Sequence, residues 1–316
     1  MAETERYEVL PAEHEVVTAS NASAGEPVRQ PSLVKVVWDF LRHDHMAFAG
    51  AVIYVFFGAM ALLAPWIAPY PPDAMLQENG QYLLFAPPSL EHLLGTTSAG
   101  RDVFSQLVYG ARPTLIVGFT AALLVVAVGT VVGLIAGFYG GWVDDVLMRL
   151  TDVAFGIPFE PFVIVLIAFT EPSIWNIVLA MGLLLWRDTA RVVRSQVLTL
   201  KERSYVEAAV VQGATPLRIL FVHIAPNVLP ISLLYGSFAI GWAILTEASL
   251  SFLGFGDPAS FSWGFMLQDA YVSQALSREA YYWFIPPGVC IMLTVMAGFF
   301  LSRGAEEHLF PRLRQE

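Results

Sequence analysis

Cysteine, lysine and charge of either sign are all scarce in this sequence. Only 14% of its 316 residues are charged and 56% are hydrophobic, whereas about a quarter of a soluble domain is charged. The single cysteine, Cys290, excludes an intramolecular disulfide and a multi-cysteine metal site. Lys35 and Lys201 are the only lysines, and a net charge of −10 argues against a nucleic-acid partner. The acidic, lysine-poor composition suggests a salt-adapted host.

The sequence also lacks the signatures of nucleotide and metal chemistry. It contains no Gly-x-x-x-x-Gly-Lys-Ser/Thr phosphate loop, so we expect the chain to bind no ATP and not to be an enzyme by itself. Two loop histidines, His92 and His223, have no second ligand at metal spacing. We therefore expect no metal site and no cofactor in this chain.

The hydrophobic residues come in blocks about as long as the roughly 20 residues needed to cross a bilayer. Backbone groups find no water in hydrocarbon, so each block is expected to form a helix. Six blocks qualify as spans: 46–68, 115–138, 153–170, 172–186, 227–246 and 281–302. The fourth is short, and it becomes a span only if it leans or begins early. The first is too long for a cleaved signal, and we expect it to be retained.

The loops between these blocks divide the basic residues unevenly. Alternating placement puts fourteen of the seventeen on one side of the membrane and three on the other. Because an excess of Lys and Arg marks the cytoplasmic side, we predict a multi-pass protein of the cell membrane with both termini in the cytoplasm. The loop 187–226 would then be cytoplasmic, and the loops 69–114 and 247–280 external.

This topology predicts four parts. The N-terminal segment 1–45 is an acidic cytoplasmic tail whose composition is typical of partial disorder. Residues 46–113 form the first span and an external loop. Residues 114–302 form a five-helix core that contains the loop 187–226, and residues 303–316 form a cytoplasmic tail.

The loop 187–226 is too long for a simple connection between neighbouring helices. It predicts a basic helix over 186–204 and a short helix over 205–212 that ends at Gly213. A new helix starts at Thr215-Pro216, where Thr suits the N-cap and Pro the first helical position. Such a protrusion could dock its apolar face into a groove on a partner protein. It could equally be an amphipathic helix that lies on the lipid surface, and the loop pattern does not choose between the two.

The same loop carries a family resemblance. Its string Glu207-Ala-Ala-Val-Val-Gln-Gly213 resembles the EAA motif of ABC importer permeases, and His223-Ile-Ala-Pro-Asn227 resembles the ending seen in the peptide/nickel branch. In that family the loop forms a coupling helix that docks on a cytoplasmic ATPase. The residues that the resemblance assigns to coupling are Glu207, Ala208, Ala209, Gly213, Ala214, Thr215 and Pro216.

The first predicted external loop carries a second resemblance. Its string His92-Leu-Leu-Gly-Thr-Thr-Ser-Ala-Gly-Arg-Asp102 resembles the His-x-Leu-Gly-Thr-Asp-x-x-Gly-Arg-Asp signature of the C-type permease in this family. Thr97 stands where the signature has Asp. The signature residues are His92, Gly95, Thr96, Gly100, Arg101 and Asp102. The stretch 247–264 and the turn at Gly140-Gly141 also resemble the family, and the resemblance covers residues 90 to about 300.

The resemblance implies an all-α integral membrane fold of the type I, MetI-like kind, with six transmembrane helices and a cytoplasmic coupling loop. It implies one permease of an ATP-driven importer of peptides or a related solute, such as nickel or an oligosaccharide. The implied partners are a paralogous B-type permease, ABC ATPase subunits that bind the ATP, and an external solute-binding protein. The sequence does not choose the cargo.

Two other functional classes are alternatives to the importer permease. An ion-coupled secondary transporter tends to have internal repeats and several ionisable groups within its spans, whereas only Glu160 lies inside a predicted span and no clear repeat is visible. A membrane scaffold would leave the ordered family strings unexplained. Glu160 is expected to line the pathway or to lie near the cytoplasmic edge. Glu247, at the outer end of the fifth span, is expected in the pathway or at the headgroup level.

Overall fold

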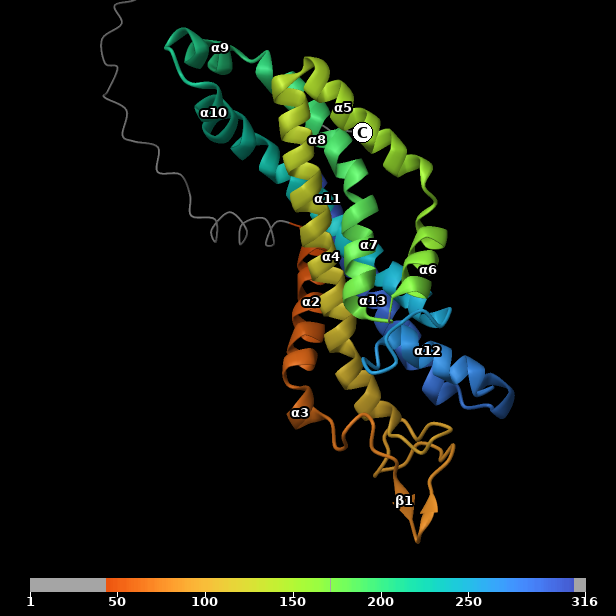
Figure 1. Cartoon of the computed structure of the whole chain (residues 1–316). Helices are drawn as coiled ribbons and strands as arrows, with labels where there is room; N and C mark the ends of the chain where they lie inside the picture. The colour runs from red at the N-terminus through yellow and green to blue at the C-terminus, as the bar shows by residue number, and fades with distance from the viewer. Residues whose placement is uncertain (1–43, 171, 310–316) are drawn as a thin grey trace, which may run out of the picture. The chain divides into compact units, whose positions relative to one another are not determined.

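The computed structural model describes residues 44–170 and 172–309, with side chains to residue 306 (Figure 1). The chain divides into two units, Met1–Trp38 and Asp39–Glu316, and all described residues belong to the second. The predicted tail 1–45 therefore lies almost wholly outside the described residues, as does the end of the predicted tail 303–316.

The described unit is built almost entirely of helices. In chain order its elements are α2 (His45–Leu62), α3 (Ala64–Ile67), β1 (Gln77–Glu78), β2 (Gln81–Tyr82), α4 (Val103–Tyr139), α5 (Gly141–Gly156), α6 (Phe159–Phe169), α7 (Ile174–Leu184), α8 (Trp186–Lys201), α9 (Ser204–Val211), α10 (Pro216–Arg218), the π-helix η1 (Ile219–Ile224), α11 (Ala225–Phe252), α12 (Trp263–Val272), the 3₁₀ helix η2 (Leu276–Arg278) and α13 (Tyr281–Leu309). β1 and β2 form an antiparallel hairpin in which Gln77 pairs with Tyr82.

Among the described residues, four helical segments are long and apolar enough to cross a membrane. They are α2, α4, the continuous run Pro216–Phe252 that ends in α11, and α13 up to Glu306. The pair α5–α6 makes a fifth if it is counted as one bent span. α7 has 11 residues, which is too short to cross by itself. Length and composition thus support four or five of the six predicted spans.

The third predicted span, 153–170, is not one helix. α5 ends at Gly156, α6 begins at Phe159, and the two axes differ by 82°. Pro158 disfavours the helical conformation at the preceding residue, and Ile157 is indeed extended. The segment 139–152, predicted as a loop, is mostly helical because it forms the first part of α5.

α4 begins at Val103, twelve residues before the predicted start of the second span at residue 115. The predicted span begins only after Arg112, because this charged residue interrupts the apolar run. In the structure Arg112 donates hydrogen bonds to the carbonyl oxygens of Ala61 and Leu62 at 2.6 and 3.4 Å. The C-terminal end of α2 therefore accommodates the charge beside α4.

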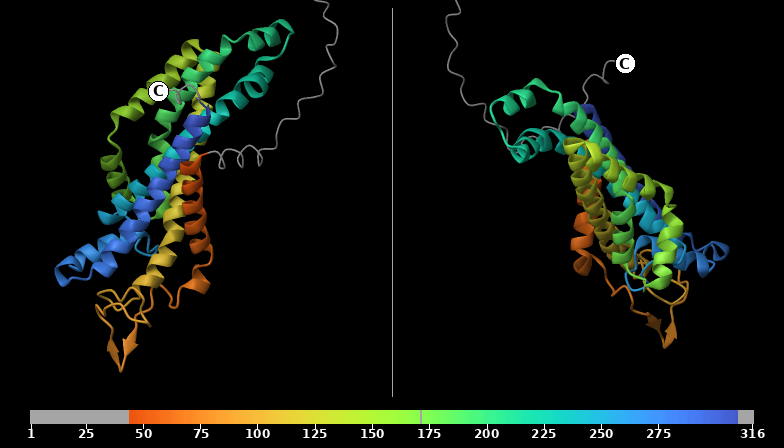
Figure 2. Two further views of the ribbon diagram at one scale, coloured as in Figure 1. Left: turned by 180° about the vertical axis from the view of Figure 1, so that it is seen from behind. Right: turned by 45° about the horizontal axis from the view of Figure 1, so that its top comes forward.

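The packing is organised around α4, which contacts α2, α7, α8 and α11 along its length, while α13 packs between α2 and α11 (Figures 1 and 2). Three glycines at four-residue spacing, Gly129, Gly133 and Gly137, form one stripe of α4 that faces α8. A Cβ atom on Gly133 would lie 2.6 Å from the carbonyl oxygen of Ala190. Small residues at this spacing let two helices approach closely. The stripe fixes α8 directly against α4.

Candidate functional sites at the two ends of α4

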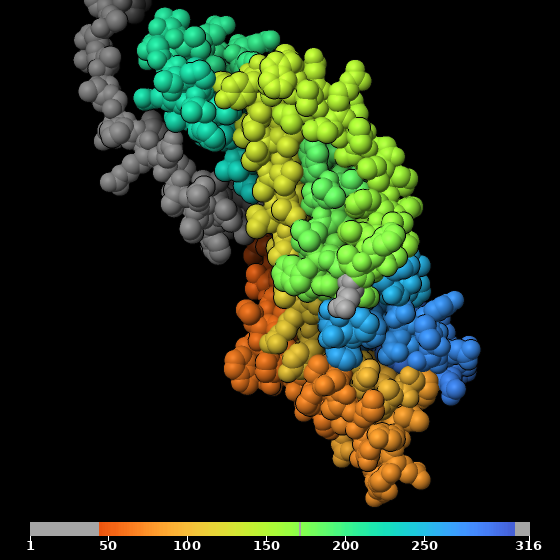
Figure 3. Space-filling model, in the orientation of Figure 1, coloured from red at the N-terminus to blue at the C-terminus, as the bar shows by residue number. Residues whose placement is uncertain are grey.

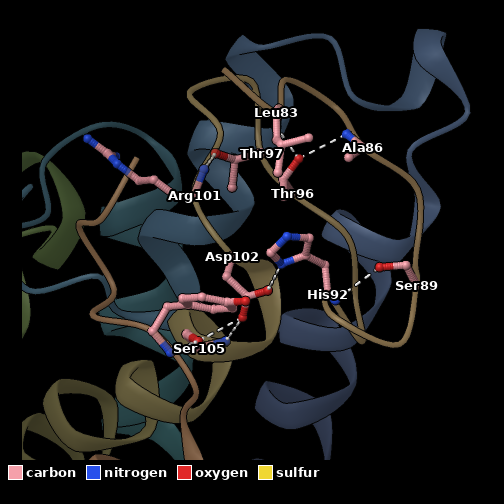
Figure 4. A network of polar contacts seen from close by, with 10 residues as sticks. Leu83, Ala86, Ser89, His92, Thr96, Thr97, Arg101, Asp102 and Ser105 are labelled. Carbon is pink, nitrogen blue, oxygen red and sulfur yellow. Dashed lines mark hydrogen bonds and ion pairs between the residues drawn. The ribbon is translucent and has the colours of Figure 1, made fainter. Parts of the chain in front are cut away.

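Asp102 organises the loop that precedes α4 (Figure 4). It is the N-cap of the helix, and its Oδ2 accepts hydrogen bonds from the backbone N–H and the hydroxyl of Ser105, both at 2.7 Å. Its Oδ1 lies 3.2 Å from Nδ1 of His92. Asp102 is 1% exposed and His92 6% exposed, so neither is available to a solute. The two residues hold the loop onto the start of the helix.

The buried side chains of Thr96 and Thr97 make hydrogen bonds to backbone groups of the same loop. The Thr96 hydroxyl accepts from the backbone N–H of Ala86 at 2.9 Å and donates to the carbonyl oxygen of Leu83. The Thr97 hydroxyl accepts from the N–H of Arg101 at 3.1 Å and that of Ala99 at 3.2 Å. A side-chain oxygen at this position caps the turn, as Asp does, which accounts for Thr97 in place of the signature Asp.

Two signature glycines fit this loop for steric reasons. Gly95 and Gly100 have φ angles of +66° and +70°. A Cβ atom on Gly95 would also lie 2.4 Å from the carbonyl oxygen of Ala86. This conformation favours glycine.

Arg101 joins the loop to the segment that follows α11. Its guanidinium lies 5.4 Å from the ring centre of Phe261 and interacts electrostatically with Asp269 of α12. Burial raises the pKa of Asp269, and Arg101 opposes that shift. The hydroxyls of Ser98 and Ser273 lie 2.8 Å apart in the same junction. No local sequence pattern predicts these contacts, because they join residues more than 150 positions apart.

At the other end of α4, α9 and α10 form a protruding hairpin, residues 204–218, which we call the α9–α10 hairpin (Figure 3). Gly213 has a φ of +79° at its turn, and the Thr215 hydroxyl caps the next helix by accepting from the N–H of Arg218 at 3.4 Å. Pro216 is the first helical residue. These local features confirm the predicted helix end and restart.

The hairpin has an inner and an outer face. Val206 and Ala209 are 4% and 7% exposed, and Val206 belongs to the core cluster with Ile219 and Leu220 of η1. The outer residues are Tyr205, Glu207, Ala208, Val210, Val211, Gln212 and Leu217. Of the residues that the resemblance assigned to coupling, Ala209 and the half-buried Ala214 therefore pack inside the hairpin, while Glu207, Ala208 and Pro216 are exposed.

The three arginines of α8 face α5. Arg194 makes a bidentate ion pair with both carboxylate oxygens of Asp144, and Arg191 pairs with Asp152 at 2.6 Å. Arg187 donates to a backbone carbonyl oxygen of α5 at 2.5 Å. The hydrogen bond with Asp144 raises the pKa of Arg194. These arginines tie α8 to α5, so they do not form a free basic face for lipid headgroups.

We expect the Arg194–Asp144 pair to stabilise the fold more than the Arg191–Asp152 pair. The side chains of the first pair are 33% and 13% exposed, and those of the second 48% and 55%, so water screens the second more. Double-mutant cycles with alanine, read from unfolding in detergent, should give a coupling of about 1 kcal/mol for the first and under about 0.5 kcal/mol for the second. Equal couplings would contradict this ranking.

The two candidate pathway carboxylates, Glu160 and Glu247, lie in different environments. Glu160 is in the first turn of α6 and exposed, because the predicted span is broken just before it. Glu247 is 1% exposed within α11, and the Ser251 hydroxyl donates to its Oε1 at 2.7 Å. The Ser262 hydroxyl at the start of α12 also interacts with this carboxyl. Glu247 is therefore buried where α11 meets α12.

We expect Glu247→Gln to retain stability and Glu247→Ala to lose it. Glutamine keeps the shape and an oxygen for the Ser251 hydroxyl, while alanine leaves a cavity and unpaired hydroxyls, at a cost of about 2–3 kcal/mol. Thermal unfolding of the purified protein measures both, with the exposed Glu160→Ala as the control. A Gln variant as unstable as the Ala variant would show that the carboxyl itself is needed.

Comparison with known proteins decides the class. Residues 129–315 match the family described as binding-protein-dependent transport system inner membrane component, and residues 32–88 match the N-terminal TM domain of oligopeptide transport permease C. The chain belongs to this permease family. The resemblance to a C-type permease of a peptide ABC importer is thereby confirmed.

The permease is similar along nearly its whole length to curated transport proteins. It is 34% identical over 316 residues to the dipeptide transport system permease protein DppC of Bacillus subtilis (strain 168), covering 98% of this chain and 96% of the relative. It is 36% identical over 302 residues to the oligopeptide transport system permease protein OppC of the same strain, covering 94% and 96%. It is 35% identical over 294 residues to the glutathione transport system permease protein GsiD of Pectobacterium atrosepticum, covering 91% and 95%.

These relatives are transport permeases and not enzymes. The permease is accordingly a multi-pass protein of the inner membrane and the membrane subunit of an ABC importer. Membership in the family implies ATPase and permease partners in general.

Proposed function

We propose that this permease forms, with a paralogous permease, the path of an ATP-driven importer of peptides, and that its α9–α10 hairpin is the contact with the ATPase. The relatives named above serve dipeptides, oligopeptides and glutathione, and this favours peptides over nickel or oligosaccharides. An external solute-binding protein would deliver the peptide. The ion-coupled transporter is less well supported, because Glu160 is exposed and Glu247 is buried in a structural contact.

Six spans are proposed from the connected helices. The bent pair α5–α6 would be the third, and α7 with the first part of α8 the fourth. Only Leu185 separates α7 from α8, and its N–H still bonds to the carbonyl oxygen of Met181 at 2.8 Å. By the excess of basic residues, both termini and the hairpin would then be cytoplasmic. The β1–β2 hairpin and α12 would lie outside, where the binding protein docks.

The single observation that carries the ATPase contact is the outer face of the hairpin. The exposed fractions are 57% for Val210, 88% for Val211 and 59% for Leu217, and Glu207 is exposed beside them. An apolar face on a short helix fits a groove on a protein partner. The inner face packs on η1, which continues without a break into α11. Movement of the ATPase would thus reach a spanning helix directly.

Alternating access requires that ATP and the delivered peptide favour the same conformations of the permease pair. In this proposal two ATPase subunits close on ATP, and the hairpin transmits the closure to α11. The Arg101 junction couples the loop before α4 to α12, so the outer ends of α4 and α11 would respond together. In this proposal the chain contributes to the path and provides the hairpin that transmits the movement, and the ATPase subunits bind the ATP.

Co-purification from gently solubilised membranes tests the proposed contact. We expect Glu207→Arg and Val211→Asp to lower recovery of the ATPase by about tenfold or more, as truncation of central interface residues does. The second permease should still co-purify with both variants. Glu306→Arg, a charge reversal of an exposed acid on α13, is the matched control and should leave recovery unchanged. Equal ATPase recovery with all variants would remove the hairpin from the interface.

A further inference from the structure

One cavity in the described structure combines aromatic walls with a single acidic side chain. It has a volume of about 220 Å³ and lies between α4, α7, α8, α11 and α13. Its aromatic lining comes from Tyr235, Phe238 and Trp242 of α11 and Phe299 of α13, and its acidic side chain is Asp188 of α8. The rings of Phe238 and Phe299 meet edge to face, with centroids 5.6 Å apart. The family motifs include none of these residues.

The cavity lies at the depth of the spanning helices. Tyr235 and Trp242 each lie about one turn from the middle of α11, about 15 and 25 Å along the helix from its first residue. Thr189, which also lines the cavity, packs on Gly129 in the glycine stripe of α4. A charged side chain at such depth is costly unless it faces a cavity or a partner. Asp188 faces this cavity.

The Asp188 carboxylate is open toward a ligand. Its side chain is 62% exposed, and the nearest cation, Nε of Arg187, lies 3.9 Å away. Nη1 of Arg187 donates to the Ala154 carbonyl oxygen, and its guanidinium lies 4.7 Å from the ring centre of Phe155, so its contact with Asp188 is long and is not a hydrogen bond. The exposed carboxylate can therefore take a second cation as a closer partner. Trp242 and Phe238 are 56% and 38% exposed, so their ring faces are open as well.

We propose that this cavity binds an ammonium group of the transported solute, with Asp188 as its ion-pair partner and the aromatic rings of Trp242 and Phe238 as its walls. Ring faces attract cations, Trp most strongly, and a carboxylate adds direct charge complementarity. Apart from Thr189, the remaining lining is apolar and suits the hydrocarbon next to the ammonium. Peptides present such a group at the N-terminus and on lysine side chains. The proposal rests on the peptide-import function and adds the part of the solute that this chain recognises.

A purely structural role for Asp188 makes a different prediction. Asp188 lies in the first turn of α8, where an acidic side chain stabilises the helix N-terminus. Its removal would then lower stability but would not change selectivity between a cation and a neutral molecule of the same shape. Selectivity is therefore the readout that separates the two roles.

The test uses the assembled transporter in lipid nanodiscs. The native thiol is removed by Cys290→Ser, and Ala239→Cys places a thiol in the cavity wall, whose labelling by a neutral maleimide is followed on this chain by mass. The probes are 2-phenylethylammonium and its neutral analogue 2-phenylethanol. We expect the cation to slow labelling at a concentration about fivefold lower than the alcohol does, and we expect Asp188→Asn to abolish that difference. Glu306→Gln, which removes an exposed acid on α13, should preserve it.

Each other outcome overturns the proposal. Equal protection by the two probes, an unchanged difference in Asp188→Asn, or a thiol that is never labelled would each show that the cavity does not bind an ammonium group. ATP-driven peptide uptake by the unmodified transporter is measured separately. If uptake occurs without cation selectivity, this inference fails alone. If no peptide is taken up, the proposed function fails whatever the labelling shows.

Discussion

Replacing Gly133 by alanine is expected to destabilise the permease by about 3 kcal/mol, at the upper end of overpacking costs. A Cβ atom there would lie 2.6 Å from the Ala190 carbonyl oxygen and 2.7 Å from side-chain atoms of Val193. Neither neighbour can move without shifting α8, which the ion pairs with α5 hold in place. The measurement is the midpoint of thermal unfolding in detergent, with recovery from size exclusion as a second readout.

Gly58 in α2 provides the matched control. A Cβ atom at this position meets nothing within 4 Å, so Gly58→Ala adds a methyl group without a clash. Because alanine loses less backbone entropy than glycine in a helix, this change should be neutral or stabilising by up to about 1 kcal/mol. Opposite signs for the two substitutions are the expected result. Similar effects at both positions would show that α4 and α8 are not held by the glycine stripe.

Asp102→Ala is expected to cost about 3 kcal/mol, because it removes the N-cap of α4 and leaves buried partners unpaired. The lost interactions are the two from Ser105 at 2.7 Å and the contact with His92 at 3.2 Å. The segment before the helix should then become sensitive to protease while the helical core stays protected. Limited proteolysis with mass detection and thermal unfolding measure the two effects.

Asp102→Asn should lie between wild type and Asp102→Ala, because the amide keeps one acceptor oxygen for Ser105. Glu91→Ala, which removes an exposed acid from the same loop, should be close to wild type. If Asp102→Ala were as stable and as resistant to protease as Glu91→Ala, Asp102 would not be the organising residue of the loop.

Local signals predicted much of the structure near the α9–α10 hairpin. Gly213 after an apolar run is a strong signal for a helix end, and the Thr215-Pro216 pair is a strong signal for a helix start. The structure has the helix end and the helix start at these residues. Long uncharged blocks likewise located α2, α11 and α13. These signals are short in range, so a single sequence contains them.

The remaining features depend on contacts that no local pattern encodes. The predicted second span begins only after Arg112, because only the position of the α2 carbonyl groups shows that the Arg112 charge is satisfied. The loop predicted between the second and third spans is largely part of α5, whose Asp144 pairs with Arg194 fifty residues later. The burial of Glu247 also depends on how α12 packs against α11, which no local pattern shows. Pro158 is the exception, since a proline within an apolar block is a local signal of the α5–α6 break.

We propose that this permease conducts peptides under the control of an ATPase docked on its hairpin. Uptake of a labelled peptide into proteoliposomes that hold the complete transporter and its binding protein tests this proposal. We expect uptake that needs ATP, that persists when ion gradients are collapsed, and that Val211→Asp abolishes while Glu306→Arg does not. Uptake that continues without ATP and stops when the ion gradients are collapsed would contradict the account.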